Sequence, residues 1–249
     1  MSKKLRDKVC IITGATSGMG KAIAEKFAEE GAKLVLSGRN TERGSALAKK
    51  LKHSIFVAGD VGQSAYNEKL VTTAFENFGK LDILSLNAGI LGLGSVVDLP
   101  GALWHTTLNT NLSSIFYLSK HAIPHLEKSH GNILINASIA AYKSFPKHPA
   151  YCASKAASVA LMKQMAVEYG PDIRVNAICP GPVDTPLLQN SANAFENPET
   201  AVEDAKNTTL MKRLGTPEDI AKLALFLVSD DASWVTGTAM TIDGGIINA

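Results

Sequence analysis

Short apolar runs alternate with longer helical patterns along the whole of this 249-residue chain. The short runs are rich in β-branched residues and predict strands at 9–13, 33–36, 55–58, 81–86, 132–136, 173–178 and 239–242. The spacing of apolar residues predicts helices at 20–30, 41–51, 65–78, 104–128, 151–169 and 218–227. This alternation favours an α/β fold in which a doubly wound (Rossmann) seven-stranded parallel sheet carries helices on both faces. Because no linker or repeat interrupts the pattern, we expect residues 1–249 to form a single domain.

The composition argues against several classes of partner. A net charge of +2 provides no surplus that would favour nucleic acid or an anionic membrane surface. The apolar run 9–12 is too short for a signal peptide, and no window approaches the ~20 apolar residues of a membrane span. Cys10, Cys152 and Cys179 are odd in number and scattered, which is typical of a reducing compartment. We therefore expect a cytoplasmic protein with a small-molecule ligand and no metal site.

The segment 186–215 breaks the alternation. A connection of this length inside a compact domain is usually functional or carries small helices of its own. It follows the sixth predicted strand, and ligands bind at the carboxyl ends of the strands in open α/β sheets. We expect this segment to form a substrate lid, and the alternative is a surface insertion without a role.

A glycine-rich turn, TGATSGMG at 13–20, joins the first predicted strand to the first predicted helix. Gly14 permits a tight turn, while Gly18 and Gly20 let the backbone approach a pyrophosphate closely. The glycine spacing differs from the commonest dinucleotide-binding pattern, so its position in the first strand-to-helix turn is the stronger argument.

The second predicted strand is followed by Ser37-Gly38-Arg39-Asn40, with no carboxylate at 37 or 38. A carboxylate here would hold the ribose 2′-hydroxyl of NAD, whereas Arg39 could bind the 2′-phosphate of NADP. The residues favour NADP and leave NAD possible. Arg39 could instead be a solvated surface cation or stack on the adenine ring.

Tyr151 and Lys155 are spaced to share one face of the last long helix before the sixth strand. A tyrosine has an unperturbed pKa of about 10, and a nearby ammonium favours the phenolate and lowers that pKa. Ser138 and Asn111 lie upstream as further polar candidates. Such a pair alone is weak evidence, because its spacing often arises by chance.

Taken together, these motifs resemble the short-chain dehydrogenase/reductases over essentially the whole chain. The matching residues are TGATSGMG at 13–20, Asn87-Ala88-Gly89, Asn111, Ser138, Tyr151, Lys155, Pro180-Gly181, Thr236-Gly237 and Asp243-Gly244-Gly245. Ketoacyl-carrier-protein-reductase-like members and related alcohol dehydrogenases are the most similar in pattern. The resemblance implies an oxidoreductase that moves a hydride between a nicotinamide cofactor and a carbonyl or secondary alcohol.

The resemblance also implies which residues bind the cofactor. It places Gly14, Ser17, Gly18 and Met19 at the phosphate turn, beside Gly20, and Asp60 and Val61 at the adenine. Asn87, Ala88 and Gly89 would support the adenosine half and the central sheet. Tyr151 and Lys155 would face the nicotinamide and its ribose. Pro180, Gly181, Val183 and Thr185 would wrap the nicotinamide, with Val183 at its carboxamide and Thr185 near the phosphates.

Four residues would carry the chemistry in such an enzyme. Tyr151 would act as general acid and base, Ser138 would hydrogen-bond the reacting oxygen, and Lys155 would lower the pKa of Tyr151. Asn111 would hold a water that feeds protons to Lys155. In the contrasting interpretation Ser138 only caps a strand end and Asn111 is an ordinary helix residue. The chain would then be a catalytically silent NADP-binding regulatory or scaffold protein.

The remaining expectations concern substrate and assembly. The residues expected to form a mainly apolar pocket are Ile139, Ala140, Phe145, Leu187, Leu188, Phe195 and Met211. His148 could contact substrate, although a loop histidine more often has no such role. The helix 151–169 is apolar around most of its circumference, so it should be buried on two sides. The family resemblance supplies the second surface, and we expect a homotetramer.

Overall fold

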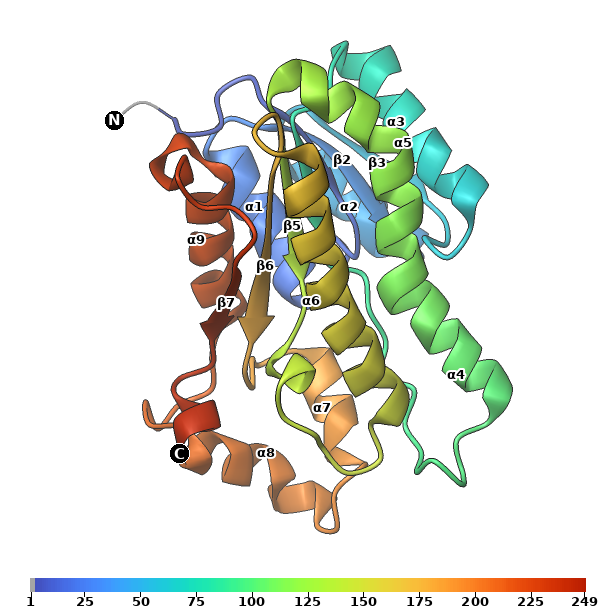
Figure 1. The fold of residues 1–249 in the computed structure, drawn as a ribbon, viewed down its shortest axis with the longest axis vertical. Coiled ribbons are helices and arrows are strands. Elements are labelled where there is room, and N and C mark those ends of the chain that lie inside the picture. The colour runs from blue at the N-terminus through green and yellow to red at the C-terminus, as the bar shows by residue number, and fades with distance from the viewer. Residues whose placement is uncertain (1–2) are drawn as a thin grey trace.

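The computed structural model describes residues 3–249 and contains one seven-stranded parallel sheet (Figure 1). The strand order is β3-β2-β1-β4-β5-β6-β7. The strands are β1 (Val9–Ile12), β2 (Lys33–Gly38), β3 (Ser54–Ala58), β4 (Ile83–Leu86), β5 (Asn132–Asn136), β6 (Arg174–Pro180) and β7 (Ala239–Ile242). The predicted doubly wound parallel fold is confirmed.

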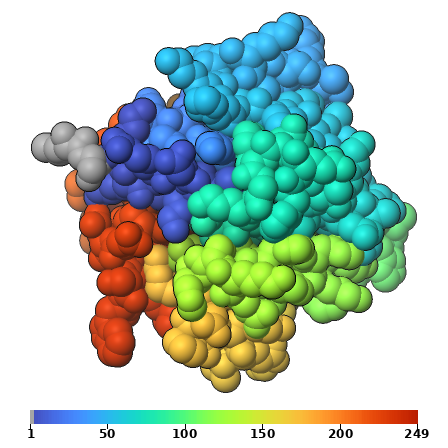
Figure 2. Space-filling model, turned by 90° about the horizontal axis from the view of Figure 1, so that it is seen from above, coloured from blue at the N-terminus to red at the C-terminus, as the bar shows by residue number. Residues whose placement is uncertain are grey.

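Helices cover both faces of this sheet (Figure 1). They are α1 (Gly18–Glu29), α2 (Thr41–Lys50), α3 (Ser64–Phe78), α4 (Gly101–Leu108), α5 (Ser114–Ser129), α6 (Pro149–Tyr169), α7 (Pro186–Ala192), α8 (Pro198–Thr208) and α9 (Pro217–Val228). Seen from above, α3, α5 and α6 lie side by side in cyan, green and yellow (Figure 2). Helices α1 and α9 pack against each other on the opposite face. No helix within residues 3–249 is long and apolar enough to cross a membrane.

Two apolar cores follow from the alternating directions of side chains along each strand. In β1, Val9 and Ile11 pack beneath α3, α5 and α6, whereas Cys10 and Ile12 pack beneath α1 and α9. All four side chains are fully buried. Because both faces are covered, these central strands read as continuous apolar runs rather than as alternating ones.

The chain reverses its winding direction between β1 and β4, which are neighbours at the centre of the sheet. In open α/β sheets this switch point leaves a crevice beyond the carboxyl ends of the strands. Thr13 follows β1, and its Oγ1 accepts hydrogen bonds from the backbone N–H groups of Asn87 (3.0 Å) and Ala88 (3.2 Å) after β4. The loops that carry the predicted cofactor residues are therefore bonded to each other across the crevice.

Two helical regions differ in detail from the predictions. The helix predicted at 104–128 begins earlier and consists of α4, a π-helical turn (Asn109–Ser113) and α5. The segment 186–215 contains α7 and α8, each of which begins at a proline. Proline at the first helical position has the right φ and needs no N–H partner there, so these short helices can start locally. Both helices lie beyond the carboxyl ends of the strands (Figure 1).

Candidate active site

The glycine-rich turn is shaped by close backbone contacts. Gly14 has φ +64°, and a Cβ there would lie 3.0 Å from the Cα of Ala88. A Cβ at Gly20 would lie 2.4 Å from the carbonyl oxygen of Gly14. Larger residues at these positions would separate β1 from β4 or displace α1. The turn thus presents bare backbone at the positive end of α1, which is a favourable place for a phosphate.

A cleft of about 730 Å³ runs along this turn and over the switch point. Its lining includes twelve of the residues predicted to bind the cofactor: Gly14, Ser17, Gly18, Met19, Gly20, Arg39, Asp60, Val61, Asn87, Ala88, Gly89 and Thr185. The volume of the cleft and its lining, which includes Arg39 after β2 as well as Met19 and Leu91, suit a dinucleotide. The glycine cradle and the donor groups that line it fit such a group.

Sequence reasoning missed one arginine in this cleft. Arg43 lines it together with Arg39 and Asn40. Asn40 caps α2 by accepting a hydrogen bond from the backbone N–H of Arg43 (2.8 Å), so both arginines belong to one rigid turn. The signal in the sequence was the four-residue spacing of the two arginines.

Asn136, at the carboxyl end of β5, is a second cleft residue that the sequence analysis did not select. Its side chain is 6% exposed, and its Oδ1 has no hydrogen-bond partner among residues 3–249. A buried polar atom without a partner is costly, so an unpaired acceptor on a residue that lines the cleft fits a ligand that donates to it. This orphaned atom is consistent with a polar cofactor in the cleft.

Tyr151 and Lys155 lie one turn apart at the start of α6. The Nζ of Lys155 donates to the backbone carbonyl of Asn136 at 2.7 Å and lies 5.6 Å from the centroid of the Tyr151 ring. Burial lowers the pKa of Lys155 to about 8.

The pKa of Tyr151 moves in the direction opposite to the prediction. Burial raises it to about 12, although the hydrogen-bonding influence of Ser138 acts to lower it. The physical reason is that Tyr151 is desolvated, while the Lys155 ammonium points to the Asn136 carbonyl and is itself easily deprotonated.

Ser138 follows β5 and begins a short 3₁₀ helix, Ile139–Ala141. Its Oγ accepts a hydrogen bond from the backbone N–H of Ala140 at 3.0 Å. This is a capping bond, and it occupies a lone pair of the hydroxyl rather than its proton. Ser138 and Tyr151 line the same cavity, so the serine both caps a turn and faces the space beside the tyrosine.

Asn111 lies in the π-helical turn and is 1% exposed. Its Oδ1 accepts from the backbone N–H of Ile90 (2.8 Å), and its Nδ2 donates to the Ile90 carbonyl (2.9 Å) and to Ser154 Oγ (3.0 Å). The side chain therefore ties the loop after β4 to α6 and has no N–H left for a water. Its Oδ1 and its backbone carbonyl, which accepts from Ser158 Oγ at 3.4 Å, each have the capacity to accept a further donor.

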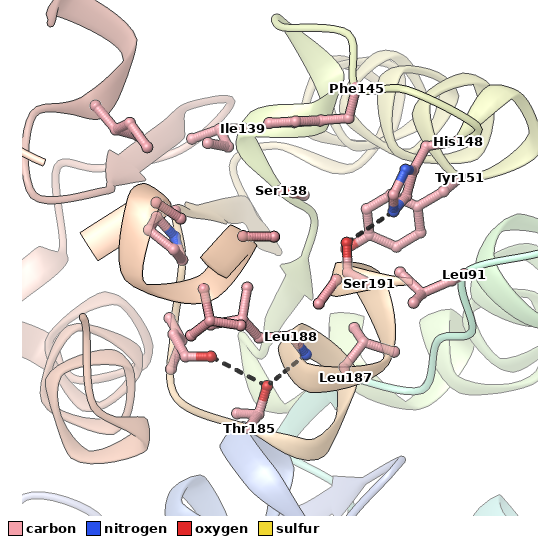
Figure 3. A pocket seen from close by; sticks show the side chains of 18 of the residues that line it. Leu91, Ser138, Ile139, Phe145, His148, Tyr151, Thr185, Leu187, Leu188 and Ser191 are labelled. Atoms are coloured by element: carbon pink, nitrogen blue, oxygen red, sulfur yellow. Dashed lines mark hydrogen bonds between the residues drawn. The ribbon is translucent and has the colours of Figure 1, made fainter. Parts of the chain in front are cut away.

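The second cavity, of about 130 Å³, lies between Tyr151 and the segment 186–215 (Figure 3). Most of its lining is apolar, and the predicted Ile139, Phe145, Leu187, Leu188 and Phe195 belong to it. Ala140 is buried away from the cavity, and Met211 is 64% exposed, so the prediction was wrong for these two. Met19, Leu91, Thr185 and Leu187 line both spaces, so the cavity opens beside the cleft.

The other predicted cofactor residues are divided between these spaces and the interior. Gly181 and Val183 line the small cavity rather than the cleft. Pro180 ends β6 and pairs with Ile242, and it lines neither space. Lys155 also lines neither, because its side chain is 5% exposed behind Tyr151 and beside Gly89, where a Cβ would lie 3.7 Å from its Nζ.

Comparison with known proteins agrees with this architecture. Residues 14–247 match the family model described as enoyl-(acyl carrier protein) reductase. An uncharacterised oxidoreductase of Thermotoga maritima is 38% identical, with 96% of each chain covered. The 3-oxoacyl-[acyl-carrier-protein] reductase of the same organism is 33% identical, with 98% of this chain and 99% of the relative covered. The chain belongs to the short-chain dehydrogenase/reductase family, whose members use a nicotinamide cofactor and act on CH–OH or C=O groups.

The fold agrees equally well with solved structures of this family. The crystal structure of levodione reductase superposes with a TM-score of 0.93 at 34% identity, covering 98% of this chain and 99% of that one. The predicted family is thus confirmed, and the chain is an oxidoreductase of this class.

Proposed function

We propose that this chain transfers a hydride between NADP and the carbonyl or secondary alcohol carbon of a small uncharged substrate, with Tyr151 as general acid and base. The observation that carries the proposal is the shared lining of the two spaces. Tyr151 and Ser138 face a cavity that joins the dinucleotide-sized cleft at Met19 and Leu91. The nicotinamide of the cofactor supplies the hydride in reduction and accepts it in oxidation.

Tyr151 moves the proton. With its pKa raised to about 12, its hydroxyl is protonated at neutral pH and can donate to the carbonyl oxygen of a substrate. In the oxidative direction the same oxygen has to act as a phenolate, which is scarce at neutral pH. A positioned general acid of this kind contributes about 100- to 10,000-fold to the rate.

Ser138 stabilises the charge that develops on the reacting oxygen. Because its Oγ already accepts from the backbone N–H of Ala140, the hydroxyl proton remains available to donate. A donor fixed in place before the reaction needs no reorganisation when charge appears. In this role Ser138 donates its hydroxyl proton to the reacting oxygen, while its capping bond with Ala140 only holds the side chain in place.

Lys155 and Asn111 support Tyr151 from behind. The ammonium uses one N–H for the Asn136 carbonyl, and two remain for a cofactor ribose and for proton exchange. Asn111 positions Ile90 and Ser154 through its side chain, so we assign its water-holding role to its backbone carbonyl.

The preference for NADP over NAD rests on two arginines. Arg39 and Arg43 line the end of the cleft that follows β2, where a 2′-phosphate would lie. Two guanidinium groups on one capped turn suit the doubly charged 2′-phosphate of NADP. The 2′-hydroxyl of NAD would find no carboxylate on this turn to accept its hydrogen bond.

The substrate class follows from the cavity lining. Among the described residues no Lys, Arg, Asp or Glu side chain lines the cavity, and burial lowers the pKa of its one histidine, His148, which favours the neutral form. A substrate with a charged group near the reacting carbon would lose its hydration without gaining a partner. We therefore favour uncharged, mainly apolar ketones and alcohols.

The segment 186–215 serves as the lid of this cavity in our proposal. Its residues Leu188, Ser191 and Phe195 line the cavity, and so does Val202 of α8. Val183, three residues before the segment, forms a parallel bridge with Gly215 at its end. A segment anchored at its base with its helices over the cavity can open without disturbing the sheet.

We also propose a homotetramer in the cytoplasm. Phe116 on α5 and Val167 on α6 are 52% and 80% exposed, which leaves large apolar side chains on the outer layer of helices. All three cysteines are free, which suits a reducing compartment. Light scattering tests the assembly, and a monomeric mass would contradict it.

The experiment for the activity is a panel of uncharged ketones and secondary alcohols with NADPH, NADH and their oxidised forms, followed by cofactor absorbance. Tyr151→Phe is expected to lose at least about 100-fold in kcat/KM while still binding cofactor. Tyr142→Phe is the matched control, because Tyr142 lies outside both spaces. Tight cofactor binding without turnover across the panel would instead favour a silent regulatory or scaffold protein.

A further inference from the structure

The apolar cavity has polar side chains beyond those assigned to the reacting oxygen. Besides Ser138 and Tyr151, its lining contains Thr185, His148 and Ser191. Thr185 caps α7: its Oγ1 donates to the Val183 carbonyl at 3.2 Å and accepts from the backbone N–H of Leu188 at 3.4 Å. That leaves His148 and Ser191, which are bonded to each other across the cavity wall (Figure 3).

The tautomer of His148 follows from its partners. Its Nδ1 lies 2.5 Å from the backbone carbonyl of Pro146, and a carbonyl can only accept, so Nδ1 carries a proton. The side chain is 2% exposed, and this burial lowers its pKa and favours the neutral ring. In a neutral imidazole with a proton on Nδ1, Nε2 is an acceptor.

The polarity of Ser191 follows in turn. Its Oγ lies 2.8 Å from Nε2 of His148, so the hydroxyl must donate its single proton to that nitrogen. The lone pairs of Oγ are then the only hydrogen-bonding capacity that Ser191 can offer to the cavity. Ser191 is therefore an acceptor and not a donor toward a bound molecule.

Aromatic packing holds this arrangement in place. The His148 ring lies edge-on to that of Tyr151, with ring centroids 6.1 Å apart and an interplanar angle of 70°. Its centroid lies 6.2 Å from that of the Phe145 ring and 6.4 Å from that of the Phe195 ring. Because His148 immediately precedes α6, the ring that orients Ser191 is rigidly connected to the start of the helix that carries Tyr151. The His148–Ser191 hydrogen bond thereby links α7, which carries Ser191, to the start of α6, which carries Tyr151.

We propose that Ser191, oriented by His148, selects substrates that carry a hydrogen-bond donor besides the reacting group. On the carbonyl side this means a hydroxyketone, and on the alcohol side a diol. The inference rests on the proposed function and narrows its substrate class. A second hydroxyl is satisfied by the Ser191 lone pair, whereas an ether or carbonyl oxygen at that position meets another acceptor in an otherwise apolar wall.

The test compares matched probes with NADPH: hydroxycyclohexanones with the hydroxyl at each ring position, the corresponding methoxycyclohexanones, and cyclohexanone. We expect one hydroxy isomer to exceed both cyclohexanone and its own methoxy analogue by about 10- to 100-fold in kcat/KM. In Ser191→Ala this ratio should fall toward one. Thr200→Ala, on the lid but outside the cavity lining, should leave the ratio unchanged.

His148→Phe provides a readout that a purely structural role would not give. Phenylalanine keeps an aromatic ring but removes Nε2, so the Ser191 proton becomes free to donate to a substrate. The ratio of hydroxy to methoxy probe should then fall by at least about tenfold relative to the wild type, with the methoxy probe gaining. Thermal unfolding of each variant verifies that it folds.

The outcomes separate the two proposals. Turnover of cyclohexanone, methoxy and hydroxy probes at equal kcat/KM would overturn the role of Ser191 and leave the proposed function standing. Absence of turnover with every probe would count against the proposed function. In that case calorimetric binding of the cyclohexanediols, cyclohexanol and the methoxycyclohexanols still decides the inference, because equal affinities would refute it.

Discussion

The ammonium of Lys155 donates a hydrogen bond of 2.7 Å to the backbone carbonyl of Asn136, and so joins α6 to the end of β5 two residues before Ser138. This bond holds the helix that carries Tyr151 at a fixed height beside the serine. It also explains why a lysine that is 5% exposed keeps a defined position.

Replacement of this lysine should affect catalysis strongly. Lys155→Met removes the proton donor behind Tyr151 and the anchor to Asn136, and we expect kcat/KM to fall by about 100-fold or more. Lys163→Met, on the exposed side of the same helix, is the matched control. Steady-state kinetics measure this effect. A kcat/KM for Lys155→Met within tenfold of the wild-type value would show that Lys155 is not needed for the reaction.

The same replacement should change how stability depends on pH. Burial lowers the folded-state pKa of Lys155 from 10.5 to about 8, so the unfolded chain binds more protons between these values. Folding stability from this group is therefore lowest below about pH 8 and rises as the pH approaches about 10.5. In urea unfolding, the free energy of unfolding of wild type should rise relative to that of Lys155→Met as the pH increases across that window. A difference between the two proteins that stays constant with pH would contradict the lowered pKa.

The two reaction directions should respond differently to pH. Tyr151, with its pKa raised to about 12, supplies the protonated form that reduction needs throughout the neutral range. Oxidation needs the phenolate. As long as the pH is below that pKa, the phenolate fraction increases about tenfold for each unit by which the pH rises. We expect kcat/KM for alcohol oxidation to rise steadily from about pH 7 to about pH 9 while kcat/KM for reduction stays nearly level. Parallel profiles in both directions would argue against Tyr151 as the group that exchanges the proton.

Cofactor preference should depend on Arg39 and Arg43 together. Each guanidinium that binds the 2′-phosphate contributes a charge-assisted hydrogen bond, and its loss costs about 10- to 100-fold in affinity. Arg39→Ser and Arg43→Ser should each lower the NADPH-to-NADH ratio of affinities, and the double variant should lower it most. Arg213→Ser is the control, since Arg213 pairs with Asp219 outside the cleft. Unchanged ratios would mean that the arginines are solvated surface cations.

Stability should be most sensitive in the core between α1 and the sheet. Phe27 is fully buried there, and Phe27→Ala should reduce the free energy of unfolding by about 3–5 kcal/mol. Glu29→Ala on the exposed side of α1 should stay within about 0.5 kcal/mol of wild type. Urea titrations at equal protein concentration measure both, and a loss below about 1 kcal/mol for Phe27→Ala would show that this core relaxes around the cavity.

The cap at the start of α9 shows why local chemistry was readable from the sequence. Thr216 followed by Pro217, with Asp219 three residues on, has the residue types that predict an N-cap. In the structure the side chains of Thr216 and Asp219 form a reciprocal capping box. Capping bonds join residues three apart, so the residue types and their spacing are enough to predict them. The same holds for Tyr151 and Lys155, which one helical turn brings together.

Helices α7 and α8 show the opposite case. Within α7 only Ala192 is buried, and α8 has no buried residue, so neither carries an apolar stripe that a period of 3.6 would reveal. Met211 was misplaced for a related reason, because being apolar and close in sequence to the lid does not decide which way a side chain points. The backbone path after α8 leaves it exposed.

The sequence by itself determined the parallel sheet, the family and the four residues expected to carry the chemistry. Strands buried on both faces appear in the sequence as continuous apolar runs, and side chains that share one face of a helix appear at a spacing of four residues. Only the tertiary structure decided that Asn136 leaves an unpaired acceptor on the lining of the cleft and that Ser191 donates its hydroxyl proton to His148. These relations link segments brought together by strand order and helix packing, and hydrogen bonds act over about 3 Å in space regardless of separation along the chain.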